Sequence, residues 1–146
     1  MPVIKETIVI KGDGARVYQL IKGIERYPQF IPDVKAVKIL SADRVTRITK
    51  WHTIIDGVEF RWLERDELDD SNWMVKYRLL EGDLEKFEGE WRVKAENDHT
   101  VVTLLIDYEL GIPAFEEVMG PLLFEKVVMN ARNLLQGIKR EAEKRG

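Results

Sequence analysis

The chain has 146 residues, of which 45% are hydrophobic and 34% charged, and its formal net charge is −3. This length suits one domain with a sizeable core, and the small negative charge argues against binding to nucleic-acid phosphates. Cysteine is absent, which excludes disulfides and cysteine-based metal sites, and no apolar run approaches the ~20 residues of a membrane-spanning helix. We therefore expect one cytoplasmic domain, residues 1–146, that binds no nucleic acid.

The first third of the chain predicts one strand and two short helical segments. Val3–Lys11 has a strand pattern and lacks the basic and apolar regions of a signal peptide. Asp13 is suited to cap a helix whose apolar residues share one face. These apolar residues are Val17, Leu20, Ile21 and Ile24. The following stretch, ERYPQFIPD, contains two prolines and predicts no more than a single helical turn.

From Val34 onward the hydrophobic period changes to two, which is typical of strands with one buried face. The turns between these strands are short, and Asp56-Gly57 favours a two-residue hairpin turn. Connections this short join antiparallel neighbours. The predicted strands are Val34–Ala42, Val45–Ile55, Val58–Leu68, Asn72–Leu80, Lys86–Asn97 and Thr100–Leu110.

The last part of the chain predicts a long helix that begins at Pro121, a residue suited to the first helical position. Its ~24 residues would span ~36 Å at 1.5 Å per residue, enough to cross a sheet. We therefore predict an α+β fold, in which a seven-stranded antiparallel sheet curves around this helix. The expected apolar stripe of the helix is Phe124, Val127, Val128, Ala131, Leu135, Ile138 and Ala142.

The alternation of the late strands places aromatic residues on the face that meets the helix, with Gly89 as a gap between Phe87 and Trp91. One interpretation is a solid aromatic core, in which Gly89 allows close approach of the helix or seats a bulge. The other is a cavity lined by aromatics and a few polar groups, as in small-molecule sites. The candidate ligand-binding residues are Phe60, Trp62, Glu64, Trp73, Tyr77, Phe87, Gly89, Trp91, Tyr108, Phe124 and Val128.

Three segments resemble the START-like, helix-grip (SRPBCC) superfamily, and within it the polyketide cyclase/dehydrase and coenzyme Q-binding branch. The segments are IERYPQFIPDVKAVKIL (Ile24–Leu40), LEGDLEKFEGEWRV (Leu80–Val93) and TLLIDYELGIPAFEEVMGPLLFEKV (Thr103–Val127). The resemblance implies two short helices between the first two strands and a cavity for an apolar molecule between the sheet and the long helix. In such a cavity, Gly89 would leave room for a flat or chain-like ligand.

The main functional hypothesis is therefore a protein that carries or sequesters a lipophilic small molecule, such as a quinone, an isoprenoid or fatty chain, or a polyketide-like aromatic. One alternative is an aromatase/cyclase or dehydratase on a polyketide-like substrate, and another is a protein-interaction module. Cyclases of this superfamily are understood to use a pocket arginine, whereas here Arg61 and Arg65 have the outward parity. This difference favours binding over catalysis.

If the chain catalyses a reaction, Glu64 is the candidate acid or base, because apolar neighbours would raise its pKa. Tyr77 or Tyr108 would then donate a hydrogen bond. The alternative for Glu64 is a carboxylate at the rim, paired with a basic residue. Neither His52 nor His99 supports a catalytic set or a metal site, so we expect no metal and no cofactor. We expect a monomer or homodimer, in which transient membrane contact is possible.

Overall fold

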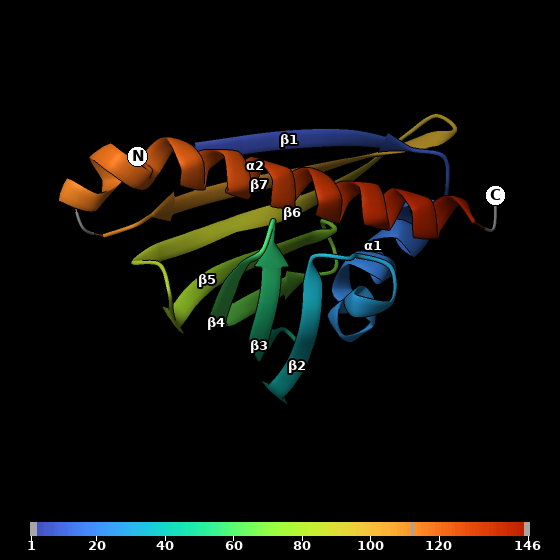
Figure 1. Ribbon diagram of the computed structural model, residues 1–146. Coiled ribbons are helices and arrows are strands. Elements are labelled where there is room, and N and C mark those ends of the chain that lie inside the picture. The colour runs from blue at the N-terminus through green and yellow to red at the C-terminus, as the bar shows by residue number, and fades with distance from the viewer. Residues whose placement is uncertain (1–2, 112, 145–146) are drawn as a thin grey trace.

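The computed structural model describes residues 3–111 and 113–144, and for residues 113–118 it describes the backbone alone (Figure 1). It contains one seven-stranded antiparallel sheet with the strand order β1-β7-β6-β5-β4-β3-β2. The strands are β1 (Val3–Ile10), β2 (Val34–Ala42), β3 (Thr46–Ile55), β4 (Val58–Asp69), β5 (Met74–Gly82), β6 (Lys86–Glu96) and β7 (His99–Glu109). The helices are α1 (Gly14–Lys22), the short 3₁₀ helix η1 (Ile24–Gln29) and α2 (Pro113–Glu143).

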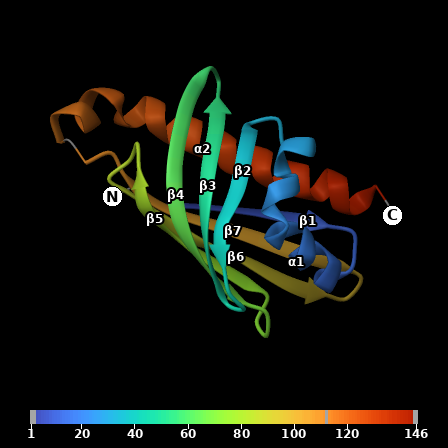
Figure 2. The same cartoon turned by 90° about the horizontal axis from the view of Figure 1, so that it is seen from below.

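The sheet is strongly twisted and curved, and α2 lies across its concave face (Figures 1 and 2). β1 and β7 run along α2, whereas β3 and β4 cross beneath it. The helices α1 and η1 lie beside the C-terminal part of α2. This arrangement confirms the predicted fold of a curved sheet around a long helix, with two short helices between the first two strands.

Local signals in the sequence explain several of these elements. The backbone N–H of Arg16 donates to the carboxylate of Asp13 at 3.3 Å, so Asp13 caps α1 as predicted. Val17 and Ile21 of α1 are buried. Asp56 and Gly57 have φ angles of 51° and 82°, which are the positive values that a tight hairpin turn between β3 and β4 requires.

The long helix begins at Pro113, so the predicted start at Pro121 is wrong. Proline lacks an N–H group and therefore removes one hydrogen bond from a helix interior. Pro121 and Leu122 are exposed on this part of α2. The helix thus continues through Pro121 where the proline faces solvent.

The core lies between the concave face of the sheet and the buried faces of α1, η1 and α2. Its most buried large residues include Tyr18, Tyr27, Ile31, Leu104 and Ile138. No helix in the described part of the chain has the length and apolar content needed to cross a membrane.

Candidate functional site

Two small cavities lie between α2 and the concave face of the sheet. The outer cavity has a volume of ≈ 30 Å³ and reaches the exposed residues Arg61 and Asp83, and the inner cavity has a volume of ≈ 40 Å³. Trp62, Phe87 and Asn130 line both cavities. Since a buried water needs roughly 10–15 Å³, each cavity has room for only a few waters. The interior is therefore neither solid nor open enough to hold a large ligand without rearrangement.

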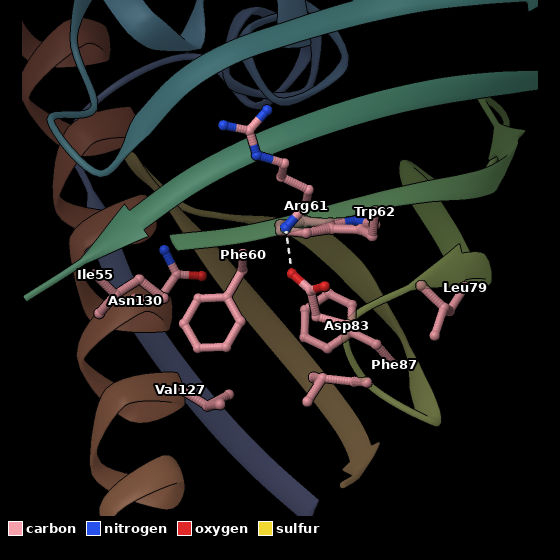
Figure 3. Close-up of a pocket in the computed structure, with 10 residues that line it drawn as sticks. Ile55, Phe60, Arg61, Trp62, Leu79, Asp83, Phe87, Val127 and Asn130 are labelled. Carbon is pink, nitrogen blue, oxygen red and sulfur yellow. Dashed lines mark hydrogen bonds between the residues drawn. The ribbon is translucent and has the colours of Figure 1, made fainter. Parts of the chain in front are cut away.

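The outer cavity is mostly apolar. Figure 3 shows the rings of Phe60 and Phe87 directed into the same space as Val127 of α2. Arg61 directs its guanidinium group away from this space, as its outward parity predicts, while its backbone N–H donates to Asp83 at 2.8 Å. An apolar group that entered here would contact aromatic and aliphatic side chains.

The inner cavity is lined by aromatic side chains that contact one another across strands. Trp51 of β3 pairs with Trp62 of β4 in the sheet register, and their rings stack with centroids 5.6 Å apart. The ring of Trp62 meets that of Phe87 edge-to-face at 5.4 Å. The rings of Trp62 and Phe87 thus lie where the two cavities meet.

A buried polar cluster, formed by Arg47, Thr49, Glu64 and Asp66, lies at the inner end of the site. Arg47 donates from Nε to Asp66 at 2.8 Å, and from Nη1 to the carbonyl of Lys22 at 2.8 Å. The indole N–H of Trp62 donates to Glu64 at 2.7 Å. Glu64 lines the inner cavity, and its side chain is buried, so the alternative of a rim carboxylate is wrong.

Glu64 and Asp66 place two carboxyl groups side by side in this cluster. Burial raises the pKa of Glu64 well above its usual value, and the hydrogen bond to Asp66 and the negative charge of Asp66 raise it further. The protonated form of Glu64 is therefore favoured over a wider pH range than that of an exposed glutamate. Among the described residues, the buried oxygen Oδ1 of Asp66 has no hydrogen-bond partner.

Gly89 lines neither of these two cavities. It pairs with Tyr77 of β5 and Ile106 of β7, and a Cβ atom at residue 89 would overlap the carbonyl oxygen of Leu105. The same Cβ atom would lie 2.7 Å from the hydroxyl oxygen of Tyr77. That hydroxyl donates to the carbonyl of Leu105 at 2.8 Å. The gap between Phe87 and Trp91 is therefore filled by the side chain of Tyr77, which corrects the expected role of Gly89.

Of the other candidate ligand-binding residues, only one lines a cavity. Trp91 lines the inner cavity, whereas Tyr108 is buried in the core without lining either cavity. Trp73 lies in the turn before β5 with φ 51°, and its ring packs against Gly14 of α1 at the edge of the core, so it lines neither cavity. Phe124 is 43% exposed and does not face the sheet as expected, because this part of α2 packs against the sheet through Leu123 and Val127. Val128 is half-buried and lines neither cavity.

The sequence pattern does not predict several of the residues that line the cavities. Trp51 and Thr53 come from β3, whose polar and apolar residues fall on both parities. Asn130 interrupts the apolar stripe of α2, but its spacing of three residues from Val127 places it on the same helical face. The described side chains contain no grouping of three or more His, Asp or Glu that could hold a metal ion.

Residues 13–135 match the model of a protein family described as polyketide cyclase/dehydrase and lipid transport. The chain belongs to this family. The protein TTHA0849 from Thermus thermophilus has a similar structure, with a TM-score of 0.91, 28% identity and 97% of each chain covered. The Zhui aromatase/cyclase from Streptomyces sp. R1128 shares the fold at a TM-score of 0.87 and 20% identity, over 99% of this chain and 94% of that one.

Membership of the cyclase/dehydrase family confirms the resemblance to the START-like superfamily. A START superfamily protein from Mycobacterium smegmatis shares the fold, with a TM-score of 0.84 and 17% identity over 99% of each chain. The ribosome association toxin RatA of Escherichia coli K12 is 23% identical over 126 residues, which are 86% of this chain and 79% of that protein. A relation to coenzyme Q binding stays a prediction.

Proposed function

We propose that the protein binds a lipophilic small molecule between α2 and the concave face of the sheet, and carries or sequesters it. A quinone, an isoprenoid or fatty chain, or a polyketide-like aromatic would suit this site. The observation that carries the proposal is the pair of adjoining cavities, apolar near the surface and bordered by polar groups inside. Concave, mostly apolar sites with a few convergent polar groups are typical of small-molecule binding.

The small volume of the cavities implies that a ligand displaces side chains as it enters. Phe60 and Phe87 are only half-buried and lie in the outer cavity, so their rings are the ones to move. The cost of moving them would be offset by burial of apolar ligand surface, at about 25 cal/mol per Å². A ligand that replaced both rings would contact Trp62 and reach the inner cavity.

Tryptophan fluorescence provides a test with a built-in control. Menadione, a small naphthoquinone, is titrated into protein freed of co-purified lipid, as checked by native mass spectrometry. We expect quenching that saturates, because Trp51 and Trp62 border the inner cavity. The variant Trp62→Phe should lose a large part of the quenching, whereas Trp73→Phe should keep it, since Trp73 packs against α1. Quenching that is absent, or equal in the two variants, would contradict binding in this cavity.

The raised pKa of Glu64, which lines the inner cavity beside Asp66, supports a second candidate function, which is acid–base catalysis on a polyketide-like substrate. A neutral carboxyl group inside an apolar cavity can deliver a proton at neutral pH. The variant Glu64→Gln keeps the size and hydrogen bonding of the side chain but cannot transfer a proton. Under this hypothesis it loses turnover of a poly-β-ketone substrate and keeps its binding. Turnover that survives in this variant would exclude Glu64 as the acid.

The match to RatA supports a third candidate, which is association with ribosomes, since that protein is named for it. Sedimentation of the purified protein with ribosomal subunits through a sucrose gradient tests this possibility. Migration with one subunit would favour an interaction module, and migration only at the top of the gradient would exclude it under those conditions.

A further inference from the structure

Asn130 is a buried amide on the helical face that otherwise presents apolar side chains to the sheet. Only 7% of it is exposed, and it lines both cavities beside Val127 and Leu134. Burial of an amide costs free energy unless its polar atoms form hydrogen bonds. The partners of its nitrogen and oxygen therefore decide what this residue does in the site.

Asp33 fixes the orientation of this amide. The side-chain nitrogen of Asn130 donates to Oδ2 of Asp33 at 3.3 Å, and Asn133 donates to the same oxygen at 3.0 Å. The backbone of Asp33 is itself held by the N–H of Ile54, which donates to its carbonyl at 2.8 Å. A carboxylate only accepts hydrogen bonds, so the nitrogen of Asn130 must face Asp33 and its oxygen must face the other way.

The oxygen of Asn130 is directed toward the ligand space. Figure 3 shows this oxygen on the side of Phe60, with the nitrogen turned away. Within the described part of the chain, no donor forms a hydrogen bond to this oxygen. Water can satisfy it when no ligand is bound. The side chain thus presents a free acceptor of fixed direction next to both cavities.

Several hydrogen-bond donors around the inner cavity are engaged by the protein itself. The indole N–H of Trp51 donates to Thr49, that of Trp62 donates to Glu64, and the hydroxyl of Tyr77 donates to Leu105. A ligand that can only accept hydrogen bonds therefore finds these donors occupied. A ligand that can donate finds the oxygen of Asn130.

We propose that Asn130 selects ligands that carry a hydroxyl group, such as phenols, hydroquinones or alcohols, because its oxygen accepts the hydroxyl proton. This inference rests on the proposed binding function and narrows its ligand class. Hydrocarbons and ethers of the same shape leave the oxygen of Asn130 without a partner. The free-energy cost of leaving a buried polar group unpaired allows a site to discriminate between ligands.

The test compares 2-naphthol with 2-methylnaphthalene, which has nearly the same shape but no hydroxyl group. Dissociation constants come from NMR titrations of the backbone amide signals, and the measured quantity is the ratio of the two constants in each variant. We expect Asn130→Leu to reduce the preference for 2-naphthol about ten-fold relative to the wild type, as loss of one hydrogen bond would. Asn133→Leu is the matched control, since it also loses a bond to Asp33 but lines neither cavity.

A second variant keeps the test valid if Asn130→Leu does not fold. In Asp33→Leu the amide of Asn130 loses the acceptor that fixes its orientation, so the preference for 2-naphthol should fall here too. An unchanged ratio in both Asn130→Leu and Asp33→Leu would overturn the role of Asn130 while leaving the binding function intact. Amide signals that do not shift with either compound in the wild type would contradict the binding function itself, and the selection with it.

Discussion

The two halves of the concave face follow the same alternation, yet they differ in chemistry. On the β3–β4 half the inward cross-strand pairs are Arg47–Asp66, Thr49–Glu64, Trp51–Trp62 and Thr53–Phe60. On the β6–β7 half they are Phe87–Tyr108, Trp91–Leu104 and Val93–Val102. α2 runs along the β1 side of the sheet and packs mainly against β1 (Figure 1). The polar pairs therefore gather on one half of the concave face. The inner cavity lies between the two halves, bordered by Trp51 and Trp62 on one and by Trp91 and Leu104 on the other.

This contrast shows how the site combines a cavity with a stable fold. Close packing of apolar side chains stabilises the β6–β7 half, as burial of apolar surface does in most cores. The β3–β4 half instead depends on hydrogen bonds that satisfy its buried charges. Each polar group there needs its partner, so single substitutions should have larger effects in this half than their size suggests.

The largest expected effect comes from breaking the buried ion pair of the polar half. Arg47→Leu leaves Asp66 buried without its partner, and removal of one partner of such a pair typically costs about 3–5 kcal/mol. We expect the free energy of unfolding, measured by urea denaturation, to fall by that amount. The double variant Arg47→Leu/Asp66→Leu should recover a large part of the loss. A single variant as stable as the wild type would show that the pair is not needed.

A slightly smaller effect is expected from Gly89→Ala on the other half. The added methyl group would overlap the carbonyl of Leu105 and crowd the hydroxyl of Tyr77, so the strands must separate. Overpacking of this kind costs about 1–3 kcal/mol. The matched control is Gly12→Ala, where a Cβ atom would meet only Ile10 and Val17 at 4.0 Å, an ordinary contact distance. That change should alter the free energy of unfolding by no more than about 0.5 kcal/mol, and equal effects of the two substitutions would contradict this interpretation of residue 89.

The smallest expected effect is a pH dependence of the free energy of unfolding, which Glu64 causes. Its pKa is raised in the folded state, so the folded chain binds this proton more tightly than the unfolded chain does. The resulting stability is complete below the unfolded pKa of about 4.3. It is then lost as the pH rises toward the higher pKa of the folded state, by up to about 1.4 kcal/mol per pH unit.

Glu64→Gln removes this titrating group, so comparison of the variant with the wild type measures its contribution to the free energy of unfolding. The difference in unfolding free energy between Glu64→Gln and the wild type should grow in favour of the variant as the pH rises from about 4.3. Denaturant unfolding at a series of pH values provides the difference. A constant difference across the series would mean that Glu64 is already ionised in the folded protein.

The sequence predicts the inward face of β4 better than that of β3. Alternation along β4 places Phe60, Trp62 and Glu64 correctly, because the aromatic residues of this strand share one parity. The residues of β3 do not separate in this way: Ile48 and Ile54 point outward while Arg47 and Trp51 point inward. Only the pairing of β3 with β4 reveals this direction, and pairing is a property of the folded sheet.

The remaining errors have a similar origin in contacts between distant segments. Trp73 lines neither cavity, because it lies in a turn with a positive φ and its ring packs beside Gly14 of α1. Phe124 is exposed although it follows the helical period, since periodicity does not reveal which part of a helix the sheet covers. At Gly89 the missing side chain is recognisable from sequence, but the residue that fills the gap comes from another strand.

The position of Arg47 disfavours ligands that carry a negative charge. Its guanidinium group is committed to Asp66 and to the end of α1, and no lysine or arginine side chain in the described part of the chain lines the inner cavity. An ionised fatty acid would have to give up its hydration there without gaining a countercharge, which is costly in a medium of low polarity. Neutral forms such as esters or fatty alcohols avoid that penalty.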